Sequence, residues 1–96
     1  MLTVTLSGIL EDDCVIKTDK NDHKYIRFRV VCDEPDFKGK PSVTIVRCYC
    51  YNMKYADLKK DDIVFLSGSF KFTQFGGKIE ADVYVKDIAL GNKLEK

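Results

Sequence analysis

Residues 43–72, "VTIVRCYCYNMKYADLKKDDIVFLSGSFKF", decide the fold of this 96-residue chain. They begin and end in runs where alternate residues differ in size and polarity, which is the pattern of β-strands. Between the two runs, "MKYADLKK" at 53–60 has the composition of a helix of about two turns. The stretch therefore predicts a strand, a short helix and a second strand.

Three further runs alternate in the same way. They are "LTVTLSGIL" at 2–10, "KYIRFRVVC" at 24–32 and "KIEADVYVKDIAL" at 78–90. Gly8 and Gly68 interrupt two of the strands, and glycines inside strands often mark bulges or bends where a sheet curls. Five strands with one short helix between the third and fourth predict an all-β protein, a five-stranded Greek-key OB-fold barrel that forms a single domain over 1–96. A different small barrel or a β-sandwich fits the same pattern.

The composition is that of a folded, soluble domain, with 45% hydrophobic and 32% charged residues. Its net charge of +1 gives no strong overall field, so any surface that binds anions must be a local patch. The start "MLTVTLSGIL" lacks the features of a signal peptide, and no apolar run approaches the ~20 residues that cross a bilayer. A cytoplasmic, nucleoid-associated protein without a membrane partner is predicted.

The cysteine spacing argues against a metal site. Cys14, Cys32, Cys48 and Cys50 contain no CxxC pair, and His23 is the only histidine. Cys48 and Cys50 are two apart in a strand pattern, so they share a face. We expect four reduced thiols, with Cys48 and Cys50 buried in the barrel, and no metal or cofactor.

The third predicted strand has an unusual outward face. Its inward positions carry small side chains, whereas Ile45, Arg47, Tyr49 and Tyr51 alternate with them. The preceding strand should lie beside it in an OB-fold and adds Arg27 and Arg29. Flat rings that stack on bases, together with cations that pair with phosphates, are typical of single-strand binding. The same side chains would also suit a protein interface, and the two faces of the strand could be reversed.

Two loops carry exposed aromatic residues. In "FTQFGG" at 72–77, the two glycines predict a hairpin tip, and Phe75 stands directly before them. Hairpin tips are usually polar, so a phenylalanine there calls for a function. In "DEPDFKGKP" at 33–41, Phe37 either anchors the loop on the barrel or joins Lys38 and Lys40 in a phosphate contact.

Five collinear segments resemble the bacterial single-stranded DNA-binding proteins over almost the whole chain. They are "LSGIL", "YIRFRVVCDEPDF", "IVRCYCYNMKYADLKK", "DDIVFLSGSF" and "ADVYVKDIAL". The chain is also similar to primosomal replication protein N. The resemblance implies base stacking at or beside Phe37, at Tyr51 and at Phe75, with a fourth position at the non-aromatic Ile45. The chain departs from the family in having no tryptophan, and it is expected to be a variant without the family's acidic tail.

These observations predict sequence-independent binding of single-stranded DNA in replication, recombination or repair, with RNA as a possible ligand. The alternative is an OB-fold module for protein interaction or oligomerisation that binds no nucleic acid. No enzyme is predicted, because the sequence shows no nucleophile with its base, no metal constellation and no phosphate-binding glycine loop. The predicted nucleic-acid-binding residues are Arg27, Arg29, Phe37, Lys38, Lys40, Arg47, Tyr49, Tyr51, Lys71 and Phe75.

Self-association is predicted from the first strand and from the resemblance, which implies assembly through this region. The outward positions of the strand, Thr3, Thr5, Ser7 and Ile9, carry no charge that would discourage pairing at its edge. We expect a homodimer or a homotetramer.

Overall fold

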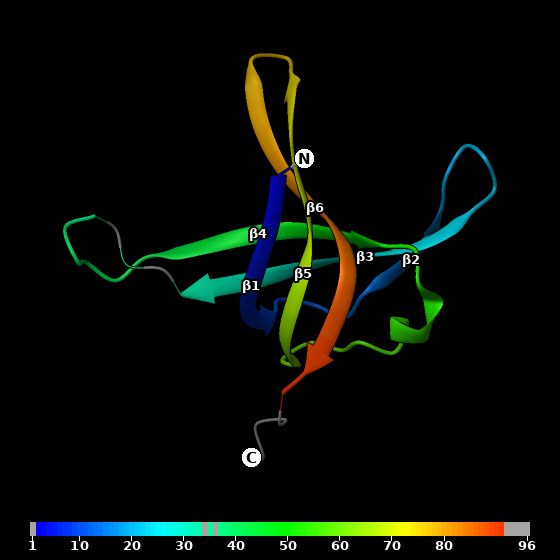
Figure 1. The fold of residues 1–96 in the computed structure, drawn as a ribbon, viewed down its shortest axis with the longest axis horizontal. Coiled ribbons are helices and arrows are strands. Elements are labelled where there is room, and N and C mark those ends of the chain that lie inside the picture. Colours follow the sequence, from blue (N-terminus) through cyan, green and yellow to red (C-terminus); the bar gives the residue numbers. More distant parts are fainter. Residues whose placement is uncertain (1, 34, 36, 92–96) are drawn as a thin grey trace.

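The computed structural model describes residues 2–33, 35 and 37–91, with the backbone alone at 73–75 and 78–81. It contains six strands and one short 3-10 helix (Figure 1). The elements are β1 (Leu2–Leu10), β2 (Val15–Thr18), β3 (Lys24–Asp33), β4 (Val43–Cys50), η1 (Met53–Tyr55), β5 (Ile63–Phe75) and β6 (Lys78–Leu90). The described part of the chain has no helix long and apolar enough to cross a membrane.

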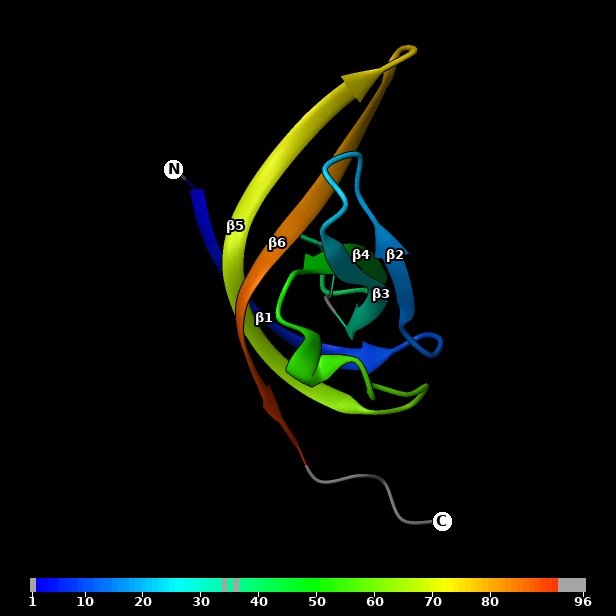
Figure 2. The same ribbon diagram turned by 90° about the vertical axis from the view of Figure 1, so that its right-hand side faces the viewer.

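Five of the strands close into a barrel (Figure 2). The order is β1-β5-β6-β4-β3, and β1 completes the circuit by pairing Ile9 with Val31 and Leu10 with Val30 of β3. β4 and β6 run parallel, and the other pairs are antiparallel. This closed circuit is the predicted OB-fold, and a sandwich is excluded.

The barrel interior confirms the predicted inward face of Cys48 and Cys50 in the third predicted strand, which is β4. Its buried core consists of Leu10, Ile26, Phe28, Val30, Cys48, Cys50, Leu58, Val64, Leu66, Val83 and Ile88. Cys48 and Cys50 are buried as expected, so the alternative with the faces reversed is wrong. All four cysteines are free thiols. Burial raises the pKa of Cys48 to about 12, which keeps this thiol protonated at neutral pH.

Two predictions about local structure are wrong. The predicted helix over 53–60 is only the 3-10 turn η1, which the side chain of Asn52 caps by accepting from the backbone N–H of Lys54. The later backbone N–H groups bond to acidic side chains instead of continuing a helix. Lys59 donates to Asp62 at 2.9 Å, and Lys60 donates to Asp13 at 2.8 Å.

The second wrong prediction concerns the segment before β3. The five predicted strands leave residues 11–23 without a strand, but Val15–Thr18 form the short strand β2, which pairs with β3 from Val15↔Arg27 to Thr18↔Lys24. β2 lies outside the closed circuit and extends the sheet at the edge of β3. A strand of four residues leaves too short an alternating run to be recognised locally.

Gly68 marks a β-bulge, as its position inside a strand suggested. The register between β5 and β6 shifts at Ser67/Gly68. A Cβ atom at Gly68 would lie 2.3 Å from the carbonyl oxygen of Tyr84, so only glycine allows β6 to approach this closely. The bulge therefore fixes the backbone that carries Tyr84.

The β5–β6 hairpin continues beyond the barrel as an arm (Figures 1 and 2). Its ladder extends from Lys71↔Asp82 to Phe75↔Lys78. Gly76 and Gly77 form the tip with φ values of 57° and 81°, which favour glycine. The predicted hairpin tip is confirmed.

Candidate nucleic-acid interface

The outer surface of β2, β3, β4 and β6 carries the candidate site. Register pairs align side chains in rows that run across these strands, because directly opposite residues in a sheet point to the same side. The row through the middle places Arg27 of β3 beside Tyr49 of β4, and Tyr49 beside Tyr84 of β6. We call this surface the tyrosine face, after Tyr25, Tyr49, Tyr51 and Tyr84.

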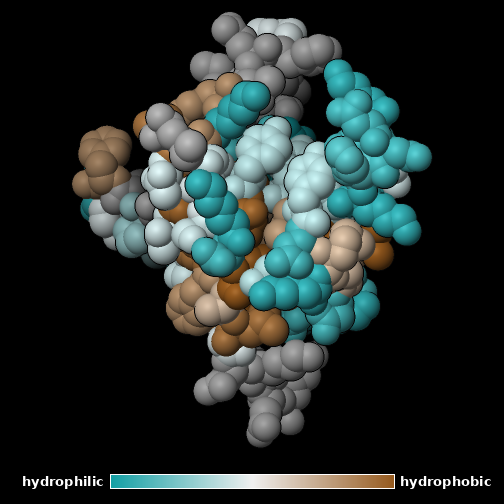
Figure 3. Space-filling view, turned by 45° about the vertical axis from the view of Figure 1, so that its right-hand side comes forward, coloured by the Kyte–Doolittle hydropathy of each residue, from teal (hydrophilic) through white to brown (hydrophobic). Residues whose placement is uncertain are grey.

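The four tyrosines form a continuous series of rings. The ring centroids of Tyr51 and Tyr25 are 5.3 Å apart, and those of Tyr25 and Tyr49 are 5.9 Å apart. Tyr49 then stacks on Tyr84 at 5.4 Å with an interplanar angle of 21°. In Figure 3, side chains of intermediate hydropathy form a pale area beside the strongly hydrophilic β2–β3 hairpin. The Tyr51–Tyr25 and Tyr25–Tyr49 pairs are tilted, with interplanar angles of 38° and 52°. The series therefore gives this side of the barrel a continuous but uneven aromatic surface.

Enough of each terminal ring is exposed to receive a base. Tyr51 is 51% exposed and Tyr84 is 39% exposed. Stacking of a base on an exposed aromatic ring contributes ~1–3 kcal/mol and depends little on base identity. The tyrosine face therefore has exposed aromatic surface at both ends of the series.

Three arginines lie on this surface in different electrostatic surroundings. Arg47 donates from Nε to Oδ1 of Asp82 at 2.8 Å. Arg29 lies 3.8 Å from a carboxylate oxygen of Glu11. Arg27 makes no ion pair with any residue that the structure describes.

Tyr51 is anchored to the β2–β3 hairpin through Asp19. The Tyr51 hydroxyl donates to Oδ2 of Asp19 at 3.1 Å. Oδ1 of Asp19 accepts from the backbone N–H groups of Asn21 and His23 at 2.9 Å each. The hydrogen bond from the backbone of His23 is the main cause that lowers the pKa of Asp19. One carboxylate thus shapes the hairpin turn and orients the Tyr51 ring.

The structure brings together half of the predicted binding residues. Those on the tyrosine face are Arg27, Arg29, Arg47, Tyr49 and Tyr51. Lys71 is exposed on β5, opposite Asp82, at the base of the arm. The side chain of Phe75 lies outside the described part of the structure, and its backbone pairs with Lys78.

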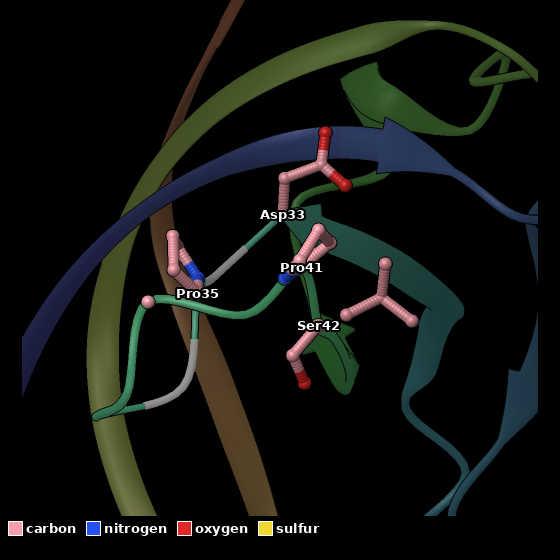
Figure 4. A pocket seen from close by; sticks show the side chains of 6 residues that line it. Asp33, Pro35, Pro41 and Ser42 are labelled. Carbon is pink, nitrogen blue, oxygen red and sulfur yellow. The ribbon is translucent and has the colours of Figure 1, made fainter.

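The remaining predicted residues lie in the loop between β3 and β4. Phe37 is 94% exposed, so the interpretation of Phe37 as an anchor on the barrel is wrong. The Nζ atom of Lys38 lies 5.7 Å from the centroid of the Phe37 ring, and Lys40 follows in the same loop. The β3–β4 loop and the adjoining strand ends also form a hollow of about 460 Å³ (Figure 4). It is lined by Asp33, Pro35, Gly39, Pro41, Ser42 and Val43.

Sequence reasoning missed three residues of this surface. They are Tyr25 and Tyr84, which lie in predicted strands but are not among the predicted binding residues, and Lys17, which lies outside the predicted strands. Lys17 stands opposite Tyr25 in the β2–β3 ladder. Tyr84 joins the site only through the parallel pairing of β4 with β6, which local alternation does not reveal.

Several solved structures of single-stranded DNA-binding proteins have a similar fold. A complex of Plasmodium falciparum SSB with ssDNA has a TM-score of 0.77 and 17% identity, with 96% of each chain covered. The S. cerevisiae mitochondrial single-stranded DNA-binding protein Rim1 has a TM-score of 0.78 and 14% identity, with 98% of this chain and 97% of that chain covered. A second form of Rim1 gives 0.74 and 13%, with 92% of each chain covered.

These comparisons establish the fold. Neither a protein-family model nor a curated protein matches the sequence. The chain nevertheless aligns with the SSB structures over nearly its full length. It therefore has an OB-fold of the SSB type, which is the fold that the sequence resemblance implied.

Proposed function

We propose that the protein binds single-stranded DNA independently of sequence through the tyrosine face. The observation that carries this proposal is the series of four tyrosine rings from β3, β4, the residue after β4, and β6, with Arg27 directly beside Tyr49. The similar fold of the P. falciparum SSB, which was solved in complex with ssDNA, supports the same ligand.

The mechanism is passive binding. Bases stack on the tyrosine rings, while phosphates pair with nearby cations, chiefly Arg27 and Lys17. Phe37, Lys38 and Lys40 extend the path into the β3–β4 loop, and Lys71 and Phe75 extend it along the arm. Stacking needs only the flat face of a base, which all bases have, so this arrangement gives no sequence preference and also accommodates RNA.

The cellular role is also a proposal, and it rests on this ligand. A protein that holds exposed single strands would act in replication, recombination or repair in the cytoplasm. The role can be tested by cross-linking cells, purifying the protein and measuring whether single-stranded DNA is recovered with it. Exclusive recovery of the protein with other proteins, without nucleic acid, would instead support the interaction module.

Tyrosine fluorescence tests the proposed binding directly, because the chain has five tyrosines and no tryptophan. Titration with oligo(dT) should quench the emission, and duplex DNA should quench it much less. Tyr84→Ala should weaken binding by ~1–3 kcal/mol. The matched control is Tyr55→Phe, since Tyr55 lies in η1, outside the tyrosine face, and should leave the affinity unchanged.

Ionic strength separates the proposal from the alternative of a protein-interaction module. Binding through phosphates weakens steeply with salt, because bound counterions are released from the nucleic acid. An absence of quenching by oligo(dT) at low salt would refute the proposed function. Parallel titrations with oligo(dT) and oligo(rU) would show whether RNA is also a ligand.

Self-association is proposed at the outer face of β1 and β5. The facing pairs Thr5↔Ser67 and Ser7↔Phe65 are uncharged, and Phe65 is 51% exposed. A second copy of the chain fits this surface, because apolar and uncharged side chains can be buried against their equivalents without a desolvated charge. Light scattering should find a homodimer or homotetramer, and monomer alone at micromolar concentration would contradict the proposal.

A further inference from the structure

We infer that Arg47 and Asp82 act as a positioning pair that holds the tyrosine face together, and that Arg27 is the arginine that contacts phosphate. This inference rests on the proposed function. It divides arginines that look equivalent in the sequence into two roles, and it follows from the surroundings of each guanidinium group.

The first step is the burial of Asp82. Its side chain is only 8% exposed, and its Oδ1 accepts from Nε of Arg47 at 2.8 Å. A buried carboxylate is costly unless a cation or several donors compensate it. Asp82 therefore holds Arg47 in place, and a phosphate that drew Arg47 away would leave the carboxylate unpaired.

The second step is the position of this ion pair beside the rings. Arg47 and Asp82 are neighbours in the β4–β6 ladder, and the same ladder pairs Tyr49 with Tyr84 two residues further along each strand. The guanidinium carbon of Arg47 lies 5.8 Å from the centroid of the Tyr49 ring. Fixing Arg47 thus fixes the stacked pair of Tyr49 and Tyr84.

The third step is the charge that remains for phosphates. The Arg47–Asp82 pair has no net charge, so a phosphate beside it gains little attraction and releases few counterions. Arg27 stands between Val15 of β2 and Tyr49 of β4, and no carboxylate among the described residues forms an ion pair with it. Its charge is next to the stacking surface and is available to phosphate.

Salt titrations distinguish the two roles. Affinity for oligo(dT) is measured over a series of NaCl concentrations for the wild type, Arg27→Ala and Arg47→Ala. Arg27→Ala should reduce the slope of log K against log[salt] by ~0.7, the value for one phosphate contact on a single strand. Arg47→Ala should weaken binding by the same factor at every salt concentration, which leaves the slope unchanged.

A second variant covers the case in which Arg47→Ala fails to fold with Asp82 unpaired. The double variant Arg47→Ala/Asp82→Asn removes both charges of the pair, and it should again lower the affinity without changing the slope. If either variant flattens the slope as much as Arg27→Ala does, Arg47 is a phosphate ligand and the inference is overturned, while the proposed function stands.

The near-UV circular dichroism of the protein without DNA provides a test that does not depend on binding. Arg47→Ala and the double variant should change the tyrosine signal, because the Tyr49–Tyr84 stack loses its support. The matched control is Arg29→Ala, which lies opposite Arg47 in β3 and is more exposed, and it should leave the signal unchanged. An unchanged tyrosine signal in the Arg47 variants would overturn the positioning role of Arg47 and Asp82 while leaving the proposed function in place. A wild type that fails to bind oligo(dT) would refute the proposed function and with it the phosphate contact of Arg27.

Discussion

Replacement of Gly68 by alanine should damage both the barrel and the tyrosine face. The added Cβ would lie 2.3 Å from the carbonyl oxygen of Tyr84 and 2.9 Å from the Cα of Val85. Ordinary contacts begin near 3.4 Å, so β5 and β6 must separate by about 1 Å at the bulge. Overpacking of this kind costs ~1–3 kcal/mol, and a weakened ladder hydrogen bond adds about 1 kcal/mol.

A loss of about 3 kcal/mol corresponds to a fall in Tm of roughly 12–24 °C for a domain of this size. Thermal and urea unfolding, followed by tyrosine circular dichroism, would measure it. Gly39→Ala is the matched control, because a Cβ there meets nothing within 4 Å and only its φ of +80° is unfavourable. That backbone penalty is about 1–2 kcal/mol.

Binding provides the second readout of this prediction. Separation of the strands moves the backbone of Tyr84 and so disturbs its stack on Tyr49. Folded Gly68→Ala protein should therefore bind oligo(dT) more weakly than Gly39→Ala does. Equal losses of stability in the two variants would show that the strands move apart easily at the bulge, and this would refute the reasoning.

Three further predictions concern single residues. Phe75→Ala should weaken oligo(dT) binding by ~1–3 kcal/mol without lowering Tm, and a lower Tm with unchanged affinity would make Phe75 a packing residue. Cys48 should react with a thiol reagent only after unfolding, because burial raises its pKa to about 12, and mass spectrometry of the labelled native protein would reveal any faster reaction. The pKa of Asp19 is lowered, so its stabilising contacts are present above its unfolded pKa and are lost as pH falls through the folded value. Tyr51→Phe lacks one of those contacts, so its Tm should fall less than that of the wild type when the pH is lowered. An equal fall in Tm in the two proteins would argue against the Tyr51–Asp19 contact.

The strands were predicted well because apolar and polar residues alternate along a strand when every second side chain is buried in the core. All five predicted strands are present, with ends that agree within three residues. The small inward face of β4 was predicted because Cys48 and Cys50 fill the narrow interior of the barrel. A local pattern is sufficient wherever one side of a strand faces the core.

The parts that could not be predicted depend on partners distant in the sequence. The ion pair of Arg47 with Asp82 joins residues that are 35 positions apart. The predicted helix failed because Asp13 and Asp62 take the backbone donors of Lys60 and Lys59, and Asp13 belongs to the segment before β2. The Lys60–Asp13 and Arg47–Asp82 contacts exist only once the barrel is formed, so alternation and helix propensity contain no record of them. The Lys59–Asp62 contact is local, and it competes with the helix directly.

The parallel pairing of β4 with β6 has a consequence for folding. It spans only three residue pairs, from Arg47↔Asp82 to Tyr49↔Tyr84, and it joins segments separated by the whole β5 strand. A long loop must close before these contacts form, so this pairing is expected late in folding. Tyr49 and Tyr84 meet across this pairing, so a partly folded chain lacks the complete binding surface.

Under the proposed function, DNA binds the closed barrel alone and stabilises it by ~2.7 kcal/mol when the free concentration of DNA is about 100 times Kd. Protein bound to DNA would then resist proteases that cleave partly unfolded forms, and unbound protein would be degraded first.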